Sequence, residues 1–385
     1  MKIVVQVKLM PEASQASALS ATLRTVNEVA CWVSEVAFEH GVPREYELRR
    51  HTYAELRARG IGSQAAQHTI KKVRDAYTTL KANIRAGNLG KPGSKRRRKA
   101  QTKPVAFRPQ AAHPFDDRCL CWQYDAQTVS IWTTSGRLKN IRFTCSADAL
   151  KSLREHRRGE SDLLERDGSF YLVAVCDIPE PDPYEPGAFI GVDLGIANIA
   201  TTSTGYKAAG RNLNRHRRQQ RELRRKLQAK GTKSAKRRLR MRRRKEQRHA
   251  KNINHIIAKK IVTEAERTSS GIALEDLGGI RQRVRLRKPQ RVTLHSWAFH
   301  QLGSFLEYKA RRAGVPLVYV DAAYTSQTCA DCDHVDKKNR IDQATLICRN
   351  CGVVAHADRN ASRNIAARGE SAWTAGRESR VPATP

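Results

Sequence analysis

Three acidic residues occupy positions at which a carboxylate could bind a metal ion. Asp193 follows an apolar run in FIGVDLGIANIATTS, Glu275 ends a short apolar run in GIALEDL, and Asp358 opens a helical pattern in HADRNASRNIAA. Each one alone also has a structural explanation: the start of a turn, a strand-edge residue and a helix N-cap, respectively. Strand ends and a helix start can converge in a fold, so the three are also candidates for one site.

Together, the three carboxylates predict metal-assisted hydrolysis of a phosphodiester. Two Mg²⁺ ions about 4 Å apart require several carboxylates and keep positions open for water and for phosphate oxygens. One ion would activate the attacking water, and the other would stabilise the leaving 3′ oxygen. Asp276 is the rival of Glu275 as a ligand, but alternation along a strand directs it to the opposite face.

Four of the nine cysteines have the spacing of a metal site. They form two CxxC pairs separated by fifteen residues: Cys329, Cys332, Cys348 and Cys351. This spacing is typical of a zinc ribbon, in which four thiolates surround one Zn²⁺ ion and leave no position for water. The sequence therefore predicts a structural zinc site rather than four unrelated buried cysteines. His334 and His356 lie nearby, but a complete cysteine set gives them no ligand role.

The remaining cysteines are scattered, which is typical of a reducing, intracellular compartment. Among them, Cys119 and Cys121 share one face of a predicted strand, and we expect both to be small buried hydrophobic side chains. No window of 18 apolar residues is present, and the opening MKIVVQVKLMPEAS lacks the apolar region of a secretory signal. We therefore expect a cytoplasmic protein without membrane contact.

The charge indicates a polyanionic partner. Lysine and arginine total 72 against 37 aspartate and glutamate residues, so the formal net charge is +35. This excess excludes an ordinary metabolic enzyme with a neutral surface and favours nucleic acid, although a ribosomal or histone-like binding protein would also carry it. Residues 211–250 hold 19 lysines or arginines and two glutamates. They predict long helices whose charges are neutralised by phosphates, with a solvated helical pair as the alternative. The few apolar anchors there are Leu213, Leu223, Leu227, Leu239 and Met241.

The first half of the chain has the pattern of a sheet with helices inserted into it. Apolar periodicity predicts helices at 12–40, 45–59 and 63–86. A basic linker follows at 87–103, in which Arg96, Arg97 and Arg98 are candidate phosphate contacts or part of a flexible loop. Strands are predicted at 3–7, 105–108, 119–124, 128–133 and 138–144, with a hairpin at Asp167-Gly168. The first strand is too short to be stable alone, so we expect it to complete a small barrel or sandwich.

Four prolines within residues 179–187 mark a boundary, beyond which the pattern becomes mixed α/β. Apolar runs predict strands at 189–193, 199–202, 272–274 and 317–320, the last of them after a helix at 297–313. The final residues, 371–385, are expected to be disordered. The predicted fold class is therefore a multidomain α+β protein.

Four motifs give the chain a resemblance to a known family. GVDLGI around Asp193, ALEDL around Glu275 and HADRNASRNI around Asp358 resemble the three motifs of a RuvC-like nuclease of the RNase H fold. TSQTC leads into the cysteine pairs between the second and third motifs. This order is similar to the TnpB (OrfB) family of insertion-sequence RNA-guided nucleases, which are related to type V CRISPR effectors. The resemblance covers residues 186–370 through specific motifs and residues 1–180 through architecture alone.

The resemblance implies an N-terminal β-barrel wedge domain with an inserted helical recognition domain, followed by a RuvC-like α/β nuclease domain with an inserted zinc ribbon. The wedge domain would comprise residues 1–10 and 104–180, and the recognition domain with its basic linker would comprise residues 11–103. The RuvC-like domain would comprise residues 186–324 and 354–370. The zinc ribbon would comprise residues 325–353, and a disordered tail residues 371–385.

The resemblance also implies a function. The protein would bind a guide RNA from the end of its own element and cut double-stranded target DNA beside a short motif. Asp193, Glu275 and Asp358 would be catalytic and would bind two Mg²⁺ ions, and the four cysteines would bind one structural Zn²⁺ ion. Further candidates are Arg359 and Arg363 for a scissile phosphate, or for a solvated helix face, and Tyr324 and Ser326 for the substrate groove.

Two other hypotheses remain open. The first is an enzyme on the same scaffold with another partner, either a miniature type V CRISPR effector or a nuclease that acts without a guide. The second is a nucleic-acid-binding regulator whose nuclease site is idle. The three retained carboxylates argue against an idle site, because clustered carboxylates carry an electrostatic cost.

Overall fold

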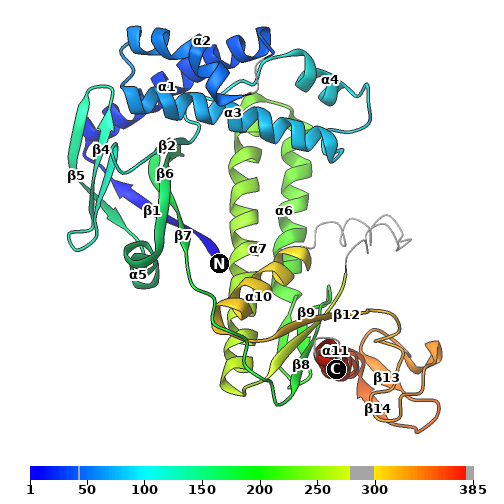
Figure 1. The fold of residues 1–385 in the computed structure, drawn as a ribbon. Helices are drawn as coiled ribbons and strands as arrows, with labels where there is room; N and C mark the ends of the chain where they lie inside the picture. Colours follow the sequence, from blue (N-terminus) through cyan, green and yellow to red (C-terminus); the bar gives the residue numbers. More distant parts are fainter. Residues whose placement is uncertain (42–43, 278–298, 379–385) are drawn as a thin grey trace, which may run out of the picture. The chain divides into compact units, whose positions relative to one another are not determined.

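The computed structural model describes residues 1–41, 44–277 and 299–378. The chain divides into two compact units, Met1–Pro179 and Glu180–Pro385, at the proline-rich segment (Figure 1). Each unit contains both a sheet and helices, so the prediction of a multidomain α+β protein is confirmed. No described helix combines the length and the apolar character that crossing a membrane requires.

The first unit is built on a seven-stranded antiparallel sheet with the strand order β2-β6-β7-β1-β5-β4-β3. The strands are β1 (Lys2–Met10), β2 (His113–Phe115), β3 (Leu120–Gln123), β4 (Thr128–Thr133), β5 (Gly136–Thr144), β6 (Arg157–Arg166) and β7 (Ser169–Asp177). β1 pairs with both β5 and β7, so the first strand completes the sheet as predicted. Buried side chains of all seven strands share one core, and the sheet forms a nearly closed barrel.

The β6–β7 hairpin turns at the two residues that the sequence indicated. Asp167 has a φ of 54° and Gly168 a φ of 74°, and the two-residue loop joins Arg166 directly to Ser169 in the ladder. A tight turn with two positive φ angles matches the right-handed twist of the strands, and Asp-Gly adopts it readily. The predicted hairpin is confirmed.

Three of the described helices that lie between β1 and β2 in the sequence form a second core. They are α1 (Ala13–Glu39), α2 (Glu45–Ala58) and α3 (Ser63–Arg85). Val33, Leu56 and Ile70 are fully or almost fully buried in this core. The predicted bounds differ from these by at most one residue at each end, because Glu12 and His40 cap α1 rather than belong to it. A further helix, α5 (Ala147–His156), packs against the sheet.

Two predictions between α3 and β2 are wrong. The linker at 87–103 contains a helix, α4 (Lys95–Thr102), because the Ser94 hydroxyl accepts the Arg97 backbone N–H and caps its first turn. Residues 105–108 form no strand. The Val105 N–H donates to the Tyr77 hydroxyl and the Phe107 N–H to the Cys31 sulfur. The backbone of this segment is therefore bonded to helices and not to a neighbouring strand.

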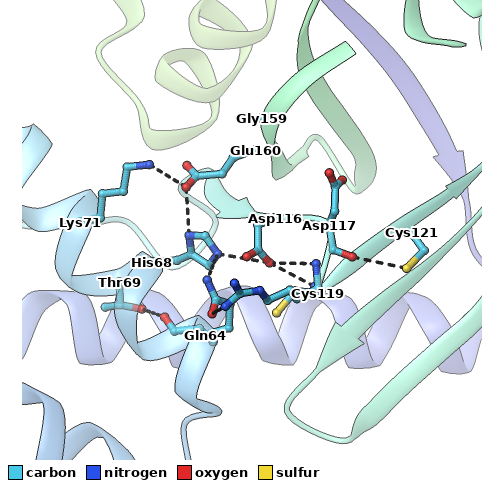
Figure 2. Close-up of polar contacts among 12 residues, drawn as sticks. Gln64, His68, Thr69, Lys71, Asp116, Asp117, Cys119, Cys121, Gly159 and Glu160 are labelled. Carbon is cyan, nitrogen blue, oxygen red and sulfur yellow. Dashed lines mark hydrogen bonds and ion pairs between the residues drawn. The ribbon is translucent and has the colours of Figure 1, made fainter. Parts of the chain in front are cut away.

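The prediction that Cys119 and Cys121 are both buried is also wrong. Cys119 is buried in the turn before β3, whereas Cys121 is exposed and its thiol faces the Asp117 carbonyl (Figure 2). Because Cys119 lies in a turn, strand alternation does not place the two on one face. In the same region, helix α3 is held to the sheet by His68, whose ring nitrogens lie 3.6 Å from Asp116 Oδ1 and 3.4 Å from Glu160 Oε1.

The second unit contains a five-stranded sheet with the order β10-β9-β8-β11-β12. The strands are β8 (Phe189–Asp193), β9 (Asn198–Thr202), β10 (Lys207–Ala209), β11 (Gly271–Glu275) and β12 (Leu317–Val320). β8, β11 and β12 run parallel, and β9 is antiparallel to β8. All four predicted strands are present. The helix predicted at 297–313 is confirmed as α10 (Phe299–Ala313), while its first two predicted residues lie outside the described part of the chain.

Helices cover both faces of this sheet. α7 (Lys233–Arg267) and α10 share a core with Ile190 and Leu274 on one face. α11 (Ala357–Glu378) packs on the other face, where Phe189 and Ala273 contact Ile365. Because side chains alternate along a strand, Asp193 and Glu275 belong to the face that α11 covers. Gly191 lies there too, and a Cβ at this position would be 1.9 Å from the Ser362 carbonyl oxygen.

The basic segment 211–250 is helical, as predicted. α6 (Arg211–Lys230) and α7 are joined by Gly231, which has a φ of 62°. Leu213 and Leu227 are buried, but Met241 is 57% exposed, so the prediction that it anchors the helices is wrong. Arg224 of α6 pairs with Glu246 of α7.

The predicted tail at 371–385 is wrong for its first eight residues, which continue α11. Trp373 explains this extension. Its ring packs against Phe189 with a centroid separation of 6.0 Å, and its Nε1–H donates to Glu185 at 3.1 Å. Tertiary packing of one aromatic side chain therefore holds a segment whose composition indicated disorder. Residues 379–385 lie outside the described part of the chain.

Candidate active site and metal centre

Asp193 and Glu275 lie at the C-terminal ends of two neighbouring parallel strands. Val192 of β8 is in register with Leu274 of β11, so the acidic residues that follow them are neighbours across the ladder. Both strands belong to the middle of the sheet, and their apolar side chains are buried on both faces. The C-terminal ends of parallel strands are where open α/β sheets bind ligands.

Asp358 reaches the same edge from the first turn of α11. Its Oδ2 accepts a hydrogen bond from the Asn198 side-chain amide at 2.7 Å, and its Oδ1 lies 3.7 Å from the Arg340 guanidinium. Asn198 begins β9, the strand that pairs with Asp193. The Asp358 side chain is thus hydrogen-bonded to the sheet and lies close to a cation that is distant in sequence. A residue that only caps a helix would need neither contact.

The three carboxylates interact electrostatically. Burial, followed by the charges of Glu275 and Asp358, raises the pKa of Asp193 to about 8, while Arg340 acts in the opposite direction. A carboxylic acid with this pKa retains its proton at neutral pH unless a positive charge offsets its neighbours. The structure therefore brings the three predicted residues into one electrostatic cluster.

Glu275 is the most buried of the three, with 9% of its surface exposed. Burial raises its pKa, whereas a hydrogen bond from Thr325 and the charge of Arg368 oppose the shift. The Thr325 Oγ1 donates to Glu275 Oε1 at 2.5 Å. Asp276, the rival candidate, is exposed, and its position one residue beyond Glu275 turns it away from the α11 face.

The carboxylates are nevertheless spread more widely than the thiols. Within the described ranges, the four cysteines are the one group of three or more acidic, cysteine or histidine side chains whose ligand atoms all lie within 4.8 Å of one another. Asp193, Glu275 and Asp358 do not form so tight a group. Their arrangement could accommodate ions and waters between the oxygens rather than a single closely held ion.

Sequence reasoning missed the residues that orient these carboxylates. Thr325, Asn198 and Arg340 contact Glu275 or Asp358 across 50, 160 and 18 positions of sequence, respectively. The only local signals were the motif TSQTC, which contains Thr325, and the stretch GIANIATTS, which contains Asn198. Arg340 gave no signal, because it lies in a polar stretch of the cysteine-containing segment, where it forms an isolated β-bridge with Leu346.

The cysteine cluster has dimensions that fit a tetrahedral metal. Two sulfur pairs are 3.7 Å apart (Cys329 and Cys351) and 3.5 Å apart (Cys332 and Cys348). Zn–S bonds of about 2.3 Å in a tetrahedron require sulfur separations of about 3.8 Å. The backbone N–H groups of Cys351 and Asn350 help to lower the pKa of Cys348, which favours the thiolate that binds a metal. A metal such as Zn²⁺ therefore fits this group.

The two CxxC pairs have the same backbone geometry. In the first, the Asp333 N–H donates to the Cys329 carbonyl, and in the second the Gly352 N–H donates to the Cys348 carbonyl, both at 3.0 Å. The donor residue has a positive φ in each case, 56° and 74°. A short two-stranded sheet, β13 (Thr345–Ile347) and β14 (Val354–His356), and a 3₁₀ turn at Lys337–Asn339 complete this segment.

Neither neighbouring histidine belongs to the thiol group. The His356 Nδ1 accepts the backbone N–H of Asp358 at 3.2 Å, and its Nε2 lies 3.1 Å from the Lys207 ammonium. The His334 carbonyl accepts the Cys329 N–H. These roles agree with the expectation that a complete cysteine set needs no histidine.

The cysteine-containing segment is fastened to α11. Asn360 bonds to the Ala330 N–H and to the Thr328 carbonyl, and Asn364 bonds to the carbonyls of Thr325 and Thr328. Both asparagines are buried. The helix that presents Asp358 therefore also fixes the backbone that presents Thr325 to Glu275.

The other nucleic-acid candidates occupy varied environments. Arg363 forms a two-point ion pair with Asp331, so it has a structural role, whereas Arg359 is exposed. Tyr324 is 62% exposed and Ser326 is partly buried. In the first unit, helix α4 carries Arg96 and Arg98 as exposed residues and Arg97 as a partly buried one.

Two regions of the chain match known families. Residues 171–278 match the OrfB family of IS605, described as "Probable transposase", and residues 299–365 match the family described as "Cas12f1-like, TNB domain". The first region contains Asp193 and Glu275. The second contains all four cysteines and Asp358.

Named relatives align with about half of the chain. It is 33% identical over 220 residues to the CRISPR-associated endodeoxyribonuclease Cas12f1 of Sulfoacidibacillus thermotolerans, covering 52% of this chain and 51% of the relative. It is 29% identical over 231 residues to the "Putative RNA-guided DNA endonuclease InsQ" of Escherichia coli (strain K12), covering 54% and 56%. The chain thus spans about half the length of the curated relatives it matches.

Solved structures share the fold. A Cas12f1 chain from a cryo-EM structure with sgRNA and target DNA matches 90% of this chain and 82% of its own length, with a TM-score of 0.56 and 14% identity. The mini-RNA-guided endonuclease CRISPR-Cas_phi3 matches 95% and 92%, with a TM-score of 0.55 and 11% identity. At such identities the likeness concerns the architecture alone.

Proposed function

We propose that this chain, a relative of the OrfB (TnpB) proteins of IS605-type elements and of the Cas12f1 endonucleases, is an RNA-guided endonuclease that cuts target DNA beside a short motif. The observation that carries this proposal is the convergence of Asp193, Glu275 and Asp358 from two strand ends and a helix start. We assign this arrangement to a RuvC-like site of the RNase H fold, as the motifs around the three residues suggest. The reaction would be Mg²⁺-dependent hydrolysis of a phosphodiester.

The electrostatics of the site support a divalent cation. Burial, and after it the charges of two neighbouring carboxylates, raise the pKa of Asp193 to about 8 although Arg340 opposes the shift, so a further positive charge would favour the ionised carboxylate. The donors are carboxylate oxygens, which Mg²⁺ prefers over thiolate or imidazole ligands. When bound, Mg²⁺ would supply Lewis-acid activation of the attacking water and stabilisation of the leaving 3′ oxygen.

The residues around the carboxylates would orient them for this task. The Thr325 hydroxyl fixes one oxygen of Glu275, and the Asn198 amide fixes one oxygen of Asp358. Such outer contacts set the direction of the remaining lone pairs and tune ligand strength. Arg340, 3.7 Å from Asp358, would place a positive charge beside the phosphate that is cut.

We assign Cys329, Cys332, Cys348 and Cys351 to one structural Zn²⁺ ion. Four thiol ligands leave no open position, so this metal would hold the fold of residues 325–353 rather than act in catalysis. The ion would affect the acidic cluster indirectly, by holding the segment that carries Thr325 and Arg340.

The basic helices α6 and α7 would hold the nucleic acid. Residues 211–250 hold 19 lysines and arginines but two glutamates, and one of those glutamates is already paired with Arg224. Charge at this density is best balanced by phosphates. Residues 1–10 and 104–180 would form the wedge domain and residues 11–103 the recognition domain, reading the motif beside the target, while base pairing with the guide selects the sequence.

A second candidate function has its own support. The 33% identity is to a CRISPR-associated Cas12f1 enzyme, so a miniature CRISPR effector remains a candidate. The chemistry would be the same, and the source of the guide would differ. Genomic position decides between them, because a transposon-end guide requires an element boundary near the gene and a CRISPR guide requires a repeat array.

The proposal is tested by the RNA that copurifies with the protein. Sequencing should find one defined RNA whose variable end directs Mg²⁺-dependent cleavage of a matching DNA duplex. Replacing that end should redirect the cut to a new sequence. Heterogeneous RNA, or cleavage that ignores the guide sequence, would contradict the proposal.

A further inference from the structure

An open groove of about 540 Å³ lies beside the acidic cluster in the second unit. Among the residues that the structure describes, its lining is Tyr319, Val320, Asp321, Ala323, Tyr324, Arg368 and Ala372. Tyr319 is 47% exposed and Tyr324 is 62% exposed, although both have large apolar rings. The exposed Tyr324 ring, small alanine walls and one arginine are the features of a surface that receives a flat aromatic ligand. The Tyr319 hydroxyl instead points toward α10, where a Cβ at Gly303 would be 3.7 Å from it.

The groove is connected directly to Glu275. Its floor residue Val320 is in register with Glu275 across the β11–β12 ladder, and the charge of Arg368 lowers the pKa of Glu275 against the effect of burial. The Arg368 guanidinium is fixed by hydrogen bonds to the carbonyls of Asp321 and Ala323, at 2.7 and 2.8 Å. A ligand in the groove would therefore lie next to the site of cleavage.

The backbone at Tyr324 is strained in a way that serves this arrangement. Its φ is 62°, a left-handed conformation that is unusual for a bulky residue. The turn is locked, because the Tyr324 carbonyl accepts the N–H groups of Gln327 and Thr328 and the Thr328 hydroxyl. The turn leaves the Tyr324 ring in the groove, while the next residue, Thr325, is 3% exposed and bonded to Glu275.

We propose that Tyr324 stacks on an unpaired base of the DNA strand being cut, next to the scissile phosphate, and positions that strand for Glu275. This inference rests on the proposed nuclease function and adds a substrate contact to it. The DNA strand is favoured over the guide because the groove adjoins the cutting site, where the guide does not react. Stacking accepts any base, since every base has a π-face, so the contact would position the strand without selecting its sequence.

Variants at Tyr324 distinguish the effect of the aromatic ring from the effect of the left-handed backbone. Tyr324→Asn tolerates the left-handed φ but removes the ring, whereas Tyr324→Phe and Tyr324→Trp keep a ring. We expect Tyr324→Asn to raise the KM for an unpaired target strand by roughly 5- to 150-fold, and both ring-bearing variants to remain near the wild type. Val354→Ala, at an exposed position of the cysteine-containing segment, is the matched control.

Stacking is also measured without cleavage. Asp193→Asn protein, which should not cut, would be mixed with target strands that carry 2-aminopurine at successive positions around the cut. Stacking on Tyr324 should quench the fluorescence of 2-aminopurine at one of these positions. Adding Tyr324→Asn should restore that fluorescence. If the wild type cuts its target but no position is quenched, or if Tyr324→Asn cuts like the wild type, the stacking inference is wrong and the proposed function stands. A wild-type protein that cuts no guided target would overturn both.

Discussion

Thr325 donates a hydrogen bond to Glu275 at 2.5 Å, between residues that are 50 positions apart. Glu275 ends a buried strand, and Thr325 begins the segment that leads into the first cysteine pair. This contact joins the acidic cluster to the cysteine centre. A change in one is therefore expected to reach the other.

Loss of the Thr325 hydroxyl should weaken Mg²⁺ binding at the acidic cluster. In Thr325→Ala, Glu275 loses the hydrogen bond that orients its carboxylate, and outer contacts of this kind are worth roughly 10- to 100-fold in metal affinity or activity. The Mg²⁺ concentration that gives half-maximal cleavage should rise, and Thr325→Ser should restore most of the activity. An unchanged Mg²⁺ titration in Thr325→Ala would show that the contact is not functional.

Removal of the structural metal should abolish cleavage but spare RNA binding. Cys332→Ser removes one of four thiols, and the segment that positions Thr325 and Arg340 should then lose its fold. Metal analysis should find about one Zn per wild-type chain and much less in the variant. Cys121→Ser, at an exposed cysteine outside the cluster, is the control. A zinc-depleted variant that cuts at the wild-type rate would show that the zinc-bound segment is not needed to position Thr325 and Arg340.

Gly191→Ala should destabilise the second unit. The new methyl group would lie 1.9 Å from the Ser362 carbonyl oxygen and 2.4 Å from the Ala366 nitrogen, so α11 would have to move away from β8. Overpacking of this kind costs about 1–3 kcal/mol or more. Thermal unfolding should show a lower transition temperature than for Gly187→Ala, whose Cβ would meet no atom within 4 Å. Equal transitions for the two variants would contradict the close packing of α11 on the sheet.

His113 should make the first unit sensitive to acid. The residue is fully buried, neither ring nitrogen has a hydrogen-bond partner, and burial holds the pKa of the imidazole well below its usual value. The unfolded chain takes up a proton near pH 6.5 that the folded state excludes, so this stability is present above pH 6.5 and is lost as the pH falls.

The corresponding measurement is the free energy of unfolding, obtained from urea titrations between pH 7.5 and 5. Its decline should be about 1 kcal/mol per pH unit steeper below pH 6.5 in the wild type than in His113→Phe. His40→Gln, at an exposed position of the same unit, should behave like the wild type. Parallel curves for the wild type and His113→Phe would show that His113 titrates freely in the folded state.

The sequence predicted the parts of the fold that depend on local patterns. The Asp167-Gly168 hairpin, the buried strands that carry Asp193 and Glu275, and the spacing of the cysteines are all readable because a few adjacent residues determine each of them. The segment 105–108 is apolar enough for a strand, yet its backbone bonds to helices. Its partner was fixed by tertiary packing, which a local pattern does not contain.

The same division applies to the site. The carboxylates themselves were predictable, because acidic residues directly after apolar runs are conspicuous. Their orienting partners were not, since Asn198 contacts Asp358 across 160 residues and Arg340 reaches it from a polar stretch that carries no motif. The left-handed backbone at Tyr324 was hidden as well, because nothing in the side-chain sequence marks it.

The central claim is tested most directly by the rate at which guided protein cuts a matching DNA duplex in Mg²⁺, compared between Glu275→Gln and Asp276→Asn. The two residues are adjacent, but Glu275 is buried in the acidic cluster and Asp276 is exposed. We predict that Glu275→Gln slows cleavage by more than roughly 100-fold. Guide binding by Glu275→Gln and the cleavage rate of Asp276→Asn should both remain near the wild-type values. Cleavage by Glu275→Gln at the wild-type rate would contradict the assignment of this cluster as the nuclease site.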